Sequence, residues 1–137
     1  MLKELMAENN IKSDELGKIL GINGSTVRRW LRGESAPFKK QLMELSSHFR
    51  CPIDYLVGRI DAFFEFKPKV CADFMSQLYS ILNAKEISTY RLNGETTIKY
   101  GHLTRWRKGT EPHLQSLIEL ADYLECSIDS LVGFEYS

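Results

Sequence analysis

Cysteine, proline and long apolar runs are scarce in this chain of 137 residues. The three cysteines, Cys51, Cys71 and Cys126, form an odd and sparse set, which predicts a reducing compartment and no disulfide framework. No apolar run approaches the roughly 18 residues that a membrane span needs, and the first residues lack the apolar core of a signal peptide. We therefore expect a cytoplasmic protein that has no membrane partner.

Recognisable catalytic and metal-binding motifs are missing as well. The sequence has no Gly-rich phosphate loop, no GxSxG elbow and no HExxH pair. Cysteine and histidine never cluster at the spacing of metal ligands. These absences predict a protein that is not an enzyme and that has no metal, cofactor or small-molecule ligand.

The 18 basic and 18 acidic residues cancel, so the total charge argues weakly against a nucleic-acid partner. The cancellation hides a difference between the two halves. Residues 1–60 hold ten Lys/Arg and seven Asp/Glu, whereas residues 61–137 hold eight and eleven. Because attraction toward phosphate depends on the local field, a one-sided basic surface is compatible with this composition.

An internal duplication organises the chain. Residues 11–33 match residues 87–109 at a shift of 76, including an Arg-Trp pair at 29–30 and at 105–106. Residues 37–58 then match residues 112–133 at a shift of 75, with ten identities in 22 positions. Repeat arrays have periods of about 20–50 residues. The longer period here favours two domains, each folded around its own core.

Helical periodicity predicts five short helices in each copy and no regular β-structure. Ser13 and Asn23 are expected to cap the second and third helices of the first copy, and Gly21 and Gly33 to end them. Ser127 is expected to cap the last helix of the second copy. The pattern predicts an all-α protein.

Two tryptophans and two cysteines occupy equivalent places in the copies. Trp30 and Trp106 fall on the inward face of their helices, which favours core packing over base stacking. Cys51 and Cys126 precede the last helix of each copy and are expected to be small buried hydrophobic residues.

A turn reading Gly-Ile-Asn, followed by a helix that ends Arg-Trp-Leu-Arg-Gly, resembles the helix-turn-helix of the phage repressor and Cro (XRE-type) family. The tail Ile-Asp-Tyr-Leu-Val-Gly is similar to the last two helices of that family. The resemblance covers nearly all of residues 1–58 and 72–133. It implies two tandem five-helix lambda-repressor-like DNA-binding domains, at 1–58 and 72–137, joined by an apolar linker at 59–71.

The resemblance also implies which residues contact DNA. A recognition helix reads bases with its first turns and one further residue on the same face, and arginine suits guanine because its planar fork meets O6 and N7 together. The base-reading positions are then Gly24, Ser25, Thr26 and Arg29 in the first copy, and Tyr100, Gly101, His102 and Arg105 in the second. The expected phosphate contacts are Ser13, Arg28, Arg32, Lys39, Lys40, Thr89, Lys99, Arg107 and Lys108.

Plainer interpretations stay open for several of these side chains. Arg29 and Arg105 could be solvated charges or members of intradomain salt bridges, and His102 could be an ordinary surface histidine. Any single lysine or arginine on a helix surface could simply be solvated. The small residues Gly24 and Gly101 read nothing themselves and would let the helix lie close to the groove.

The second copy departs further from the family pattern than the first. The family often has glutamine at the first turn of the second helix, where Ser13 and Thr89 are shorter. Thr97 replaces the glycine of the turn, and Gly94 lies inside a helix, where it costs roughly 1 kcal/mol relative to alanine. These differences predict that the second copy reads DNA less well.

The linker 59–71 carries aromatic side chains, whereas flexible tethers are rich in glycine and serine. Some of the rings Phe63, Phe64 and Phe66 must be buried, either to hold the two domains in register or to form a homodimer interface. Phe64-Glu65-Phe66 also echoes the end of the chain at 134–136, and the two segments could pair as short extended pieces.

Together these features predict sequence-specific binding of double-stranded DNA, in a transcriptional regulator of a bacterium or phage. The alternative is a protein-interaction module that binds a toxin or another regulator, in which one or both copies have lost DNA contact. Positive charge over both recognition helices would favour DNA.

Overall fold

The computed structural model describes residues 1–135, and its regular secondary structure is almost entirely helical, as the sequence predicts. The chain divides into two compact units, Met1–Lys67 and Pro68–Ser137. Each unit contains one copy of the duplicated sequence, and the all-α prediction of two tandem five-helix domains is confirmed.

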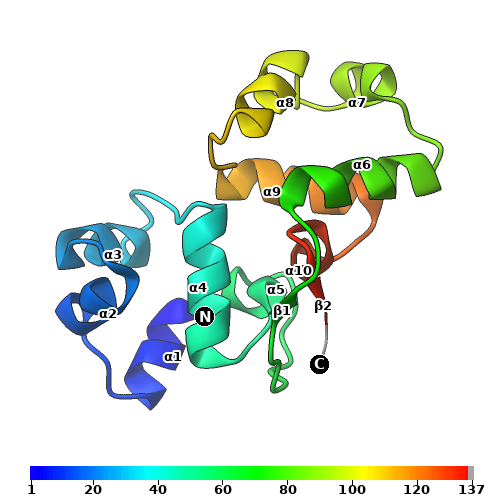
Figure 1. Ribbon diagram of the computed structural model, residues 1–137. Helices are drawn as coiled ribbons and strands as arrows, with labels where there is room; N and C mark the ends of the chain where they lie inside the picture. The colour runs from blue at the N-terminus through cyan, green and yellow to red at the C-terminus, as the bar shows by residue number, and fades with distance from the viewer. Residues whose placement is uncertain (136–137) are drawn as a thin grey trace. The chain divides into compact units, whose positions relative to one another are not determined.

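The first unit has five helices: α1 Leu2–Glu8, α2 Ser13–Leu20, α3 Gly24–Leu31, α4 Lys39–Phe49 and α5 Ile53–Leu56. Apolar side chains at helical spacing meet in one core, formed by Leu5, Met6, Leu16, Val27, Leu45, Phe49, Cys51 and Leu56. Trp30 is partly buried against this core, and Cys51 is fully buried within it. Figure 1 shows α2 and α3 side by side in this unit.

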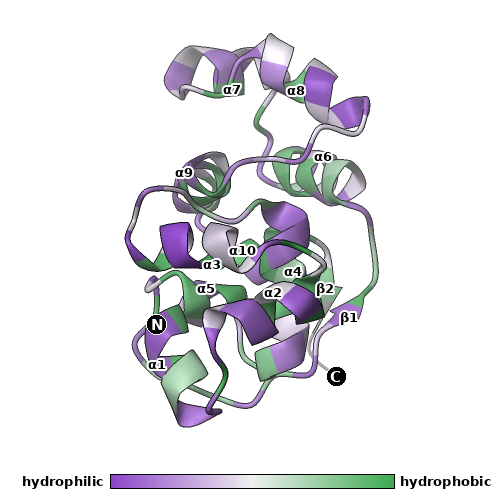
Figure 2. Ribbon diagram, turned by 90° about the vertical axis from the view of Figure 1, so that its left-hand side faces the viewer, coloured by the Kyte–Doolittle hydropathy of each residue, from purple (hydrophilic) through white to green (hydrophobic). Residues whose placement is uncertain are grey.

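The second unit repeats this plan with α6 Phe74–Ala84, α7 Thr89–Glu95, α8 Tyr100–Arg107, α9 Leu114–Leu124 and α10 Ile128–Leu131. Trp106 is buried and meets Phe74 edge to face, so both tryptophans pack inward as predicted. Cys126 is only partly buried, in contrast to its counterpart in the first unit. Figure 2 shows α6 mostly hydrophobic and α8 largely hydrophilic.

A short antiparallel pair of strands adds to the second unit. β1 Lys69–Val70 pairs with β2 Phe134–Glu135, with Val70 opposite Phe134. The predicted pairing of the end of the chain with Phe64-Glu65-Phe66 is therefore wrong for residues 134–135, because residues 69–70 take that place. Tyr136 lies outside the described residues.

The glycines and capping residues expected from the sequence mark most helix ends, and Ser13 is the exception. Gly21 ends α2 in the left-handed conformation (φ 71°), and Ser127 caps α10 by accepting a hydrogen bond from the backbone N–H of Ser130. Asn23 occupies the N-cap of α3 without a side-chain hydrogen bond. Ser13 does not cap α2: Lys12 takes the cap position and Ser13 is the first helical residue.

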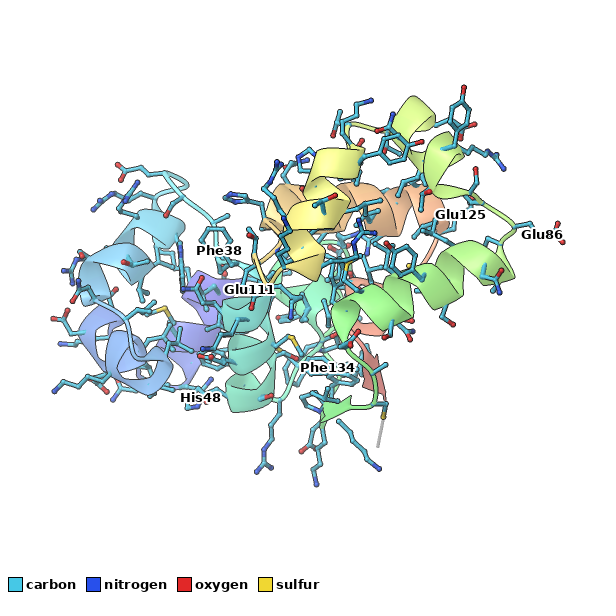
Figure 3. The ribbon with its side chains drawn as sticks, turned by 45° about the horizontal axis from the view of Figure 1, so that its top comes forward. Phe38, His48, Glu86, Glu111, Glu125 and Phe134 are labelled. Carbon is cyan, nitrogen blue, oxygen red and sulfur yellow. The ribbon has the colours of Figure 1, made fainter. Side chains whose placement is uncertain are left out.

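Four residues other than glycine adopt the left-handed conformation just after a helix of the described chain: Asn10 after α1, Arg50 after α4, Glu86 after α6 and Glu125 after α9. Glu86 and Glu125 have φ values of 56° and 53°, and Figure 3 shows them at the C-terminal ends of α6 and α9. This conformation is unfavourable for residues with a Cβ. In this conformation, Glu86 and Glu125 lead the chain into the turns before α7 and α10.

Most of the segment between the copies, residues 59–67, belongs to the first unit. Arg59 forms a 2.6 Å ion pair with buried Asp54, and Phe63 meets Tyr55 edge to face at 5.4 Å. Phe66 is buried, and its backbone N–H donates to the carbonyl of Arg50. The unit boundary lies between residues 67 and 68, inside the segment 59–71 that the sequence suggests as a linker.

The cap of α10 provides a stability prediction. Replacing Ser127 by alanine removes its bond to the Ser130 amide at 2.9 Å and should lower the free energy of unfolding of the second unit by about 1 kcal/mol. Urea unfolding monitored by Trp106 fluorescence, in a Trp30→Phe background, would measure this. Ser47→Ala changes an exposed serine of α4 and serves as the control. Equal midpoints for the two variants would show that the cap contributes nothing.

Candidate nucleic-acid interface

The turn between α2 and α3 is closed by glycine. Gly21 takes a left-handed conformation, and the Ile22 N–H then donates to the Gly17 carbonyl at 2.8 Å. A Cβ on Gly17 would lie 2.7 Å from the Ile22 carbonyl oxygen, closer than real Cβ contacts come. Gly17 therefore permits the close packing of α2 against α3 and fixes where α3 begins.

The first turn of α3 holds three of the predicted base-reading residues. Ser25 is exposed, and Gly24 and Thr26 are partly exposed. A Cβ on Gly24 would lie 2.0 Å from Oδ1 of Asp14 in α2. Gly24 thus makes room for Asp14, which is a reason for this glycine that the sequence did not reveal.

Three cations of this unit differ in how they are held. Arg28 forms a 3.0 Å ion pair with Asp14, and Arg32 forms one with Glu34, also at 3.0 Å. The hydrogen bond and charge of Arg32 lower the pKa of Glu34. The side chain of Arg29 is exposed and makes no ion pair or hydrogen bond within the described residues. Arg29 is therefore the α3 arginine available to a ligand.

The remaining predicted phosphate contacts of the first copy lie at the starts of helices. Lys39 and Lys40 begin α4, and Ser13 begins α2. The Lys39 amine lies 3.8 Å from the sulfur of Met43. Lys40 is exposed and, in the part of the chain described, no side chain holds its amine.

The equivalent turn of the second copy takes another path. Asn93 stands where the first copy has Gly17, and α7 ends at Glu95 with Thr96 fully extended (φ −132°, ψ 175°). The Asn93 carbonyl accepts from the Lys99 amine at 2.6 Å instead of from a backbone N–H of the turn. Figure 1 shows α7 and α8 apart, where α2 and α3 lie together.

Polar side chains hold this open turn in place. Asn93 Oδ1 accepts from the backbone N–H of Tyr100 at 3.0 Å. The Glu119 carboxylate accepts from the Thr97 N–H at 2.9 Å and from the Thr97 hydroxyl. These two bonds lower the pKa of Glu119, with a smaller contribution from the charge of Lys99.

Several predicted contacts of the second copy are occupied inside the unit. His102 Nδ1 accepts from the backbone N–H of Lys99, and its ring lies 5.8 Å from that of Trp106. Arg107 donates to the Tyr79 hydroxyl at 2.6 Å and to Thr104. His102 thus caps α8, and Arg107 ties α8 to α6.

The other predicted residues of the second copy are exposed, apart from Thr89, which is partly buried. Tyr100 is exposed, and Thr89 is the first residue of α7, next to the cap Ser88. A Cβ on Gly101 would lie 3.3 Å from Nη1 of Arg105, so the arginine covers the face that this glycine leaves bare. Arg105 and Lys108 are exposed, and no described residue binds either side chain.

The charged residues within α3 and within α8 are all basic: Arg28 and Arg29 in the first helix, Arg105 and Arg107 in the second. Helices that carry only positive charge suit a polyanionic ligand. Two helix-turn-helix family models match the chain. A helix-turn-helix model covers residues 2–56, and a model of the Cro/C1-type DNA-binding domain covers residues 77–136.

The chain belongs to the Cro/C1-type helix-turn-helix family. This family consists of DNA-binding regulators, not enzymes, so the predicted resemblance and DNA-binding class are confirmed at family level. No curated protein and no solved structure significantly matches the chain.

Within residues 1–135 of this Cro/C1-type protein, no three His, Cys, Asp or Glu side chains come together as a metal site. No helix there is both long and apolar enough to cross a bilayer.

Sequence reasoning missed the residues that shape the two turns. Gly17, Asp14 and Asn93 carry no motif, and Glu119 reaches Thr97 from 22 residues away. The only available signal was the alignment of the two copies, which places Asn93 opposite Gly17.

Proposed function

We propose that the protein is a sequence-specific double-stranded DNA-binding regulator of transcription in a bacterium or phage, and that α3 of the first copy reads the bases. The observation that carries the proposal is the combination of a glycine-closed turn with an exposed, unpaired Arg29 on a helix whose only charges are positive.

Each side chain of α3 has a distinct part in this proposal. Ser25 and Thr26 contact base edges or phosphate from the first turn, and Arg29 donates its fork to a guanine. Gly24 keeps the start of α3 against α2. Lys40, at the start of α4, neutralises a phosphate and fixes the register without reading sequence.

Salt dependence of binding tests the proposal. Affinity for duplex DNA should fall steeply with salt, with a logarithmic slope of about −0.9 for each neutralised phosphate. Lys40→Ala should flatten the slope by about one unit and weaken all sequences alike. Fluorescence anisotropy with a labelled duplex at several salt concentrations measures both quantities.

The matched control is Lys3→Ala, which removes an exposed lysine of α1. It should leave the slope within error of the parent. A salt-independent affinity, or equal slopes for the Lys3 and Lys40 variants and the parent, would contradict the proposed DNA contact.

A second candidate function is a protein-interaction module. It is favoured by the internal bonds of Arg28, Arg32 and Arg107, because these cations are already engaged without DNA. It differs from the first candidate in the salt titration: such a module would not bind duplex DNA with a steep slope.

A further inference from the structure

The two copies differ most at the turn that positions the recognition helix. In the first copy the Ile22 N–H closes the turn on the Gly17 carbonyl. In the second, the equivalent carbonyl of Asn93 binds the Lys99 amine, and Thr97 is held by Glu119. The second turn is thus stabilised in its open form by side chains, not merely left unclosed.

Two residues explain why the second turn does not close. A closed turn would bring the Cβ of residue 93 against the turn carbonyl, just as a Cβ on Gly17 would lie only 2.7 Å from the Ile22 carbonyl oxygen. It would also need residue 97 in the left-handed conformation of Gly21, which a β-branched threonine strongly disfavours. Asn93 and Thr97 therefore each oppose the geometry of the first copy.

The open turn also uses up groups that a base-reading helix would present to DNA. The backbone N–H of Tyr100 is bound by Asn93, and that of Lys99 by His102. The Lys99 amine is engaged with the carbonyls of Asn93 and Thr96. Arg105 and Lys108 remain as exposed cations with no side-chain partner in the described residues.

We infer that the second copy binds DNA through phosphate contacts of Arg105 and Lys108 and does not read bases, and that Asn93 and Thr97 are the residues that set this difference. Arg105 then acts as a phosphate contact, in place of the base-reading role that its sequence position suggests. This inference rests on the proposed function of α3.

Selection from a random duplex pool, combined with salt titration, tests the inference in the full chain. Arg105→Ala should leave the selected motif unchanged at every position, weaken binding to all sequences by a common factor, and flatten the salt slope by about one unit. Arg29→Ala in the same experiment should change the motif. A position of the motif that is relaxed by Arg105→Ala, or an unchanged slope, would overturn the inference.

The double variant Asn93→Gly/Thr97→Gly tests the two residues that set the difference. It should select a longer motif than the parent, because α8 can then close onto α7. The control is Gly94→Ala, at an α7 position where a Cβ meets nothing within 4 Å; it should select the parent motif. A double variant that keeps its helical circular dichroism and selects the parent motif would contradict the role given to Asn93 and Thr97.

The outcomes separate the two proposals. If the parent selects no motif at all, the proposed function fails. If the parent selects a motif that depends on both Arg29 and Arg105, the proposed function stands and the inference about the second copy fails. Should the double variant not fold, the Arg105→Ala result still decides.

Discussion

A Gly17→Asn variant, which copies the second turn into the first, is expected to destabilise the first unit by about 1–3 kcal/mol, the usual range for overpacking a close contact. The new Cβ would lie 2.7 Å from the Ile22 carbonyl oxygen and 3.0 Å from the Gly24 nitrogen. Both are backbone atoms, so a rotamer change cannot relieve the clash. The turn must open, and α3 must move away from α2.

Urea unfolding monitored by Trp30 fluorescence, in a Trp106→Phe background, measures this loss, and the selected DNA motif should disappear with it. Gly94→Asn is the matched control, since the same substitution in α7 meets open space. A Gly17→Asn protein as stable as the control, with an unchanged motif, would show that close packing of α2 on α3 is not required.

The second large effect is expected for Arg29→Ala. Removing the exposed guanidinium should relax base preference at one position of the site and weaken binding there by roughly 1–3 kcal/mol. The neighbouring Arg28 is paired with Asp14 at 3.0 Å, so the two arginines start from different positions. Competition binding with duplexes that differ at a single base pair measures the discrimination directly.

The control for this prediction is Lys40→Ala, which should weaken matched and mismatched duplexes by the same factor. If Arg29→Ala behaves like Lys40→Ala, then Arg29 contacts phosphate and the base-reading assignment of α3 is wrong. If it changes neither affinity nor discrimination, Arg29 lies outside the interface.

Local patterns predicted most of the fold. The apolar spacing located the helices because each amphipathic face must be buried, and Gly21 and Ser127 marked helix ends through their own backbone and hydroxyl chemistry. Ser13 was misassigned by one position as a cap, a shift that local signals cannot resolve.

The arrangement of the two turns could not be predicted in the same way. Thr97 was recognised as a departure from the family pattern, but its partner Glu119 comes from α9 and depends on tertiary packing. Gly17 and Asn93 look unremarkable in sequence. The close contact that requires a glycine at position 17 exists only once α2 and α3 have packed together. The hydrogen bonds made by Lys99, His102 and Arg107 likewise depend on partners that come close only in the folded unit.

The segment between the copies shows the same limit. Its aromatic content indicated burial, and Phe66 is indeed buried. Composition did not reveal that Arg59 would pair with Asp54, nor that Lys69 and Val70 would form a strand with residues 134–135. These contacts join positions far apart along the chain or require knowing which groups become buried.

The central claim, that the chain reads DNA sequence through α3, is tested most directly by selection from a random duplex pool at near-physiological salt. The parent protein is expected to enrich a defined motif, and Arg29→Ala is expected to lose the preference at one position of it. A folded parent protein that enriches no motif over the starting pool would contradict the claim.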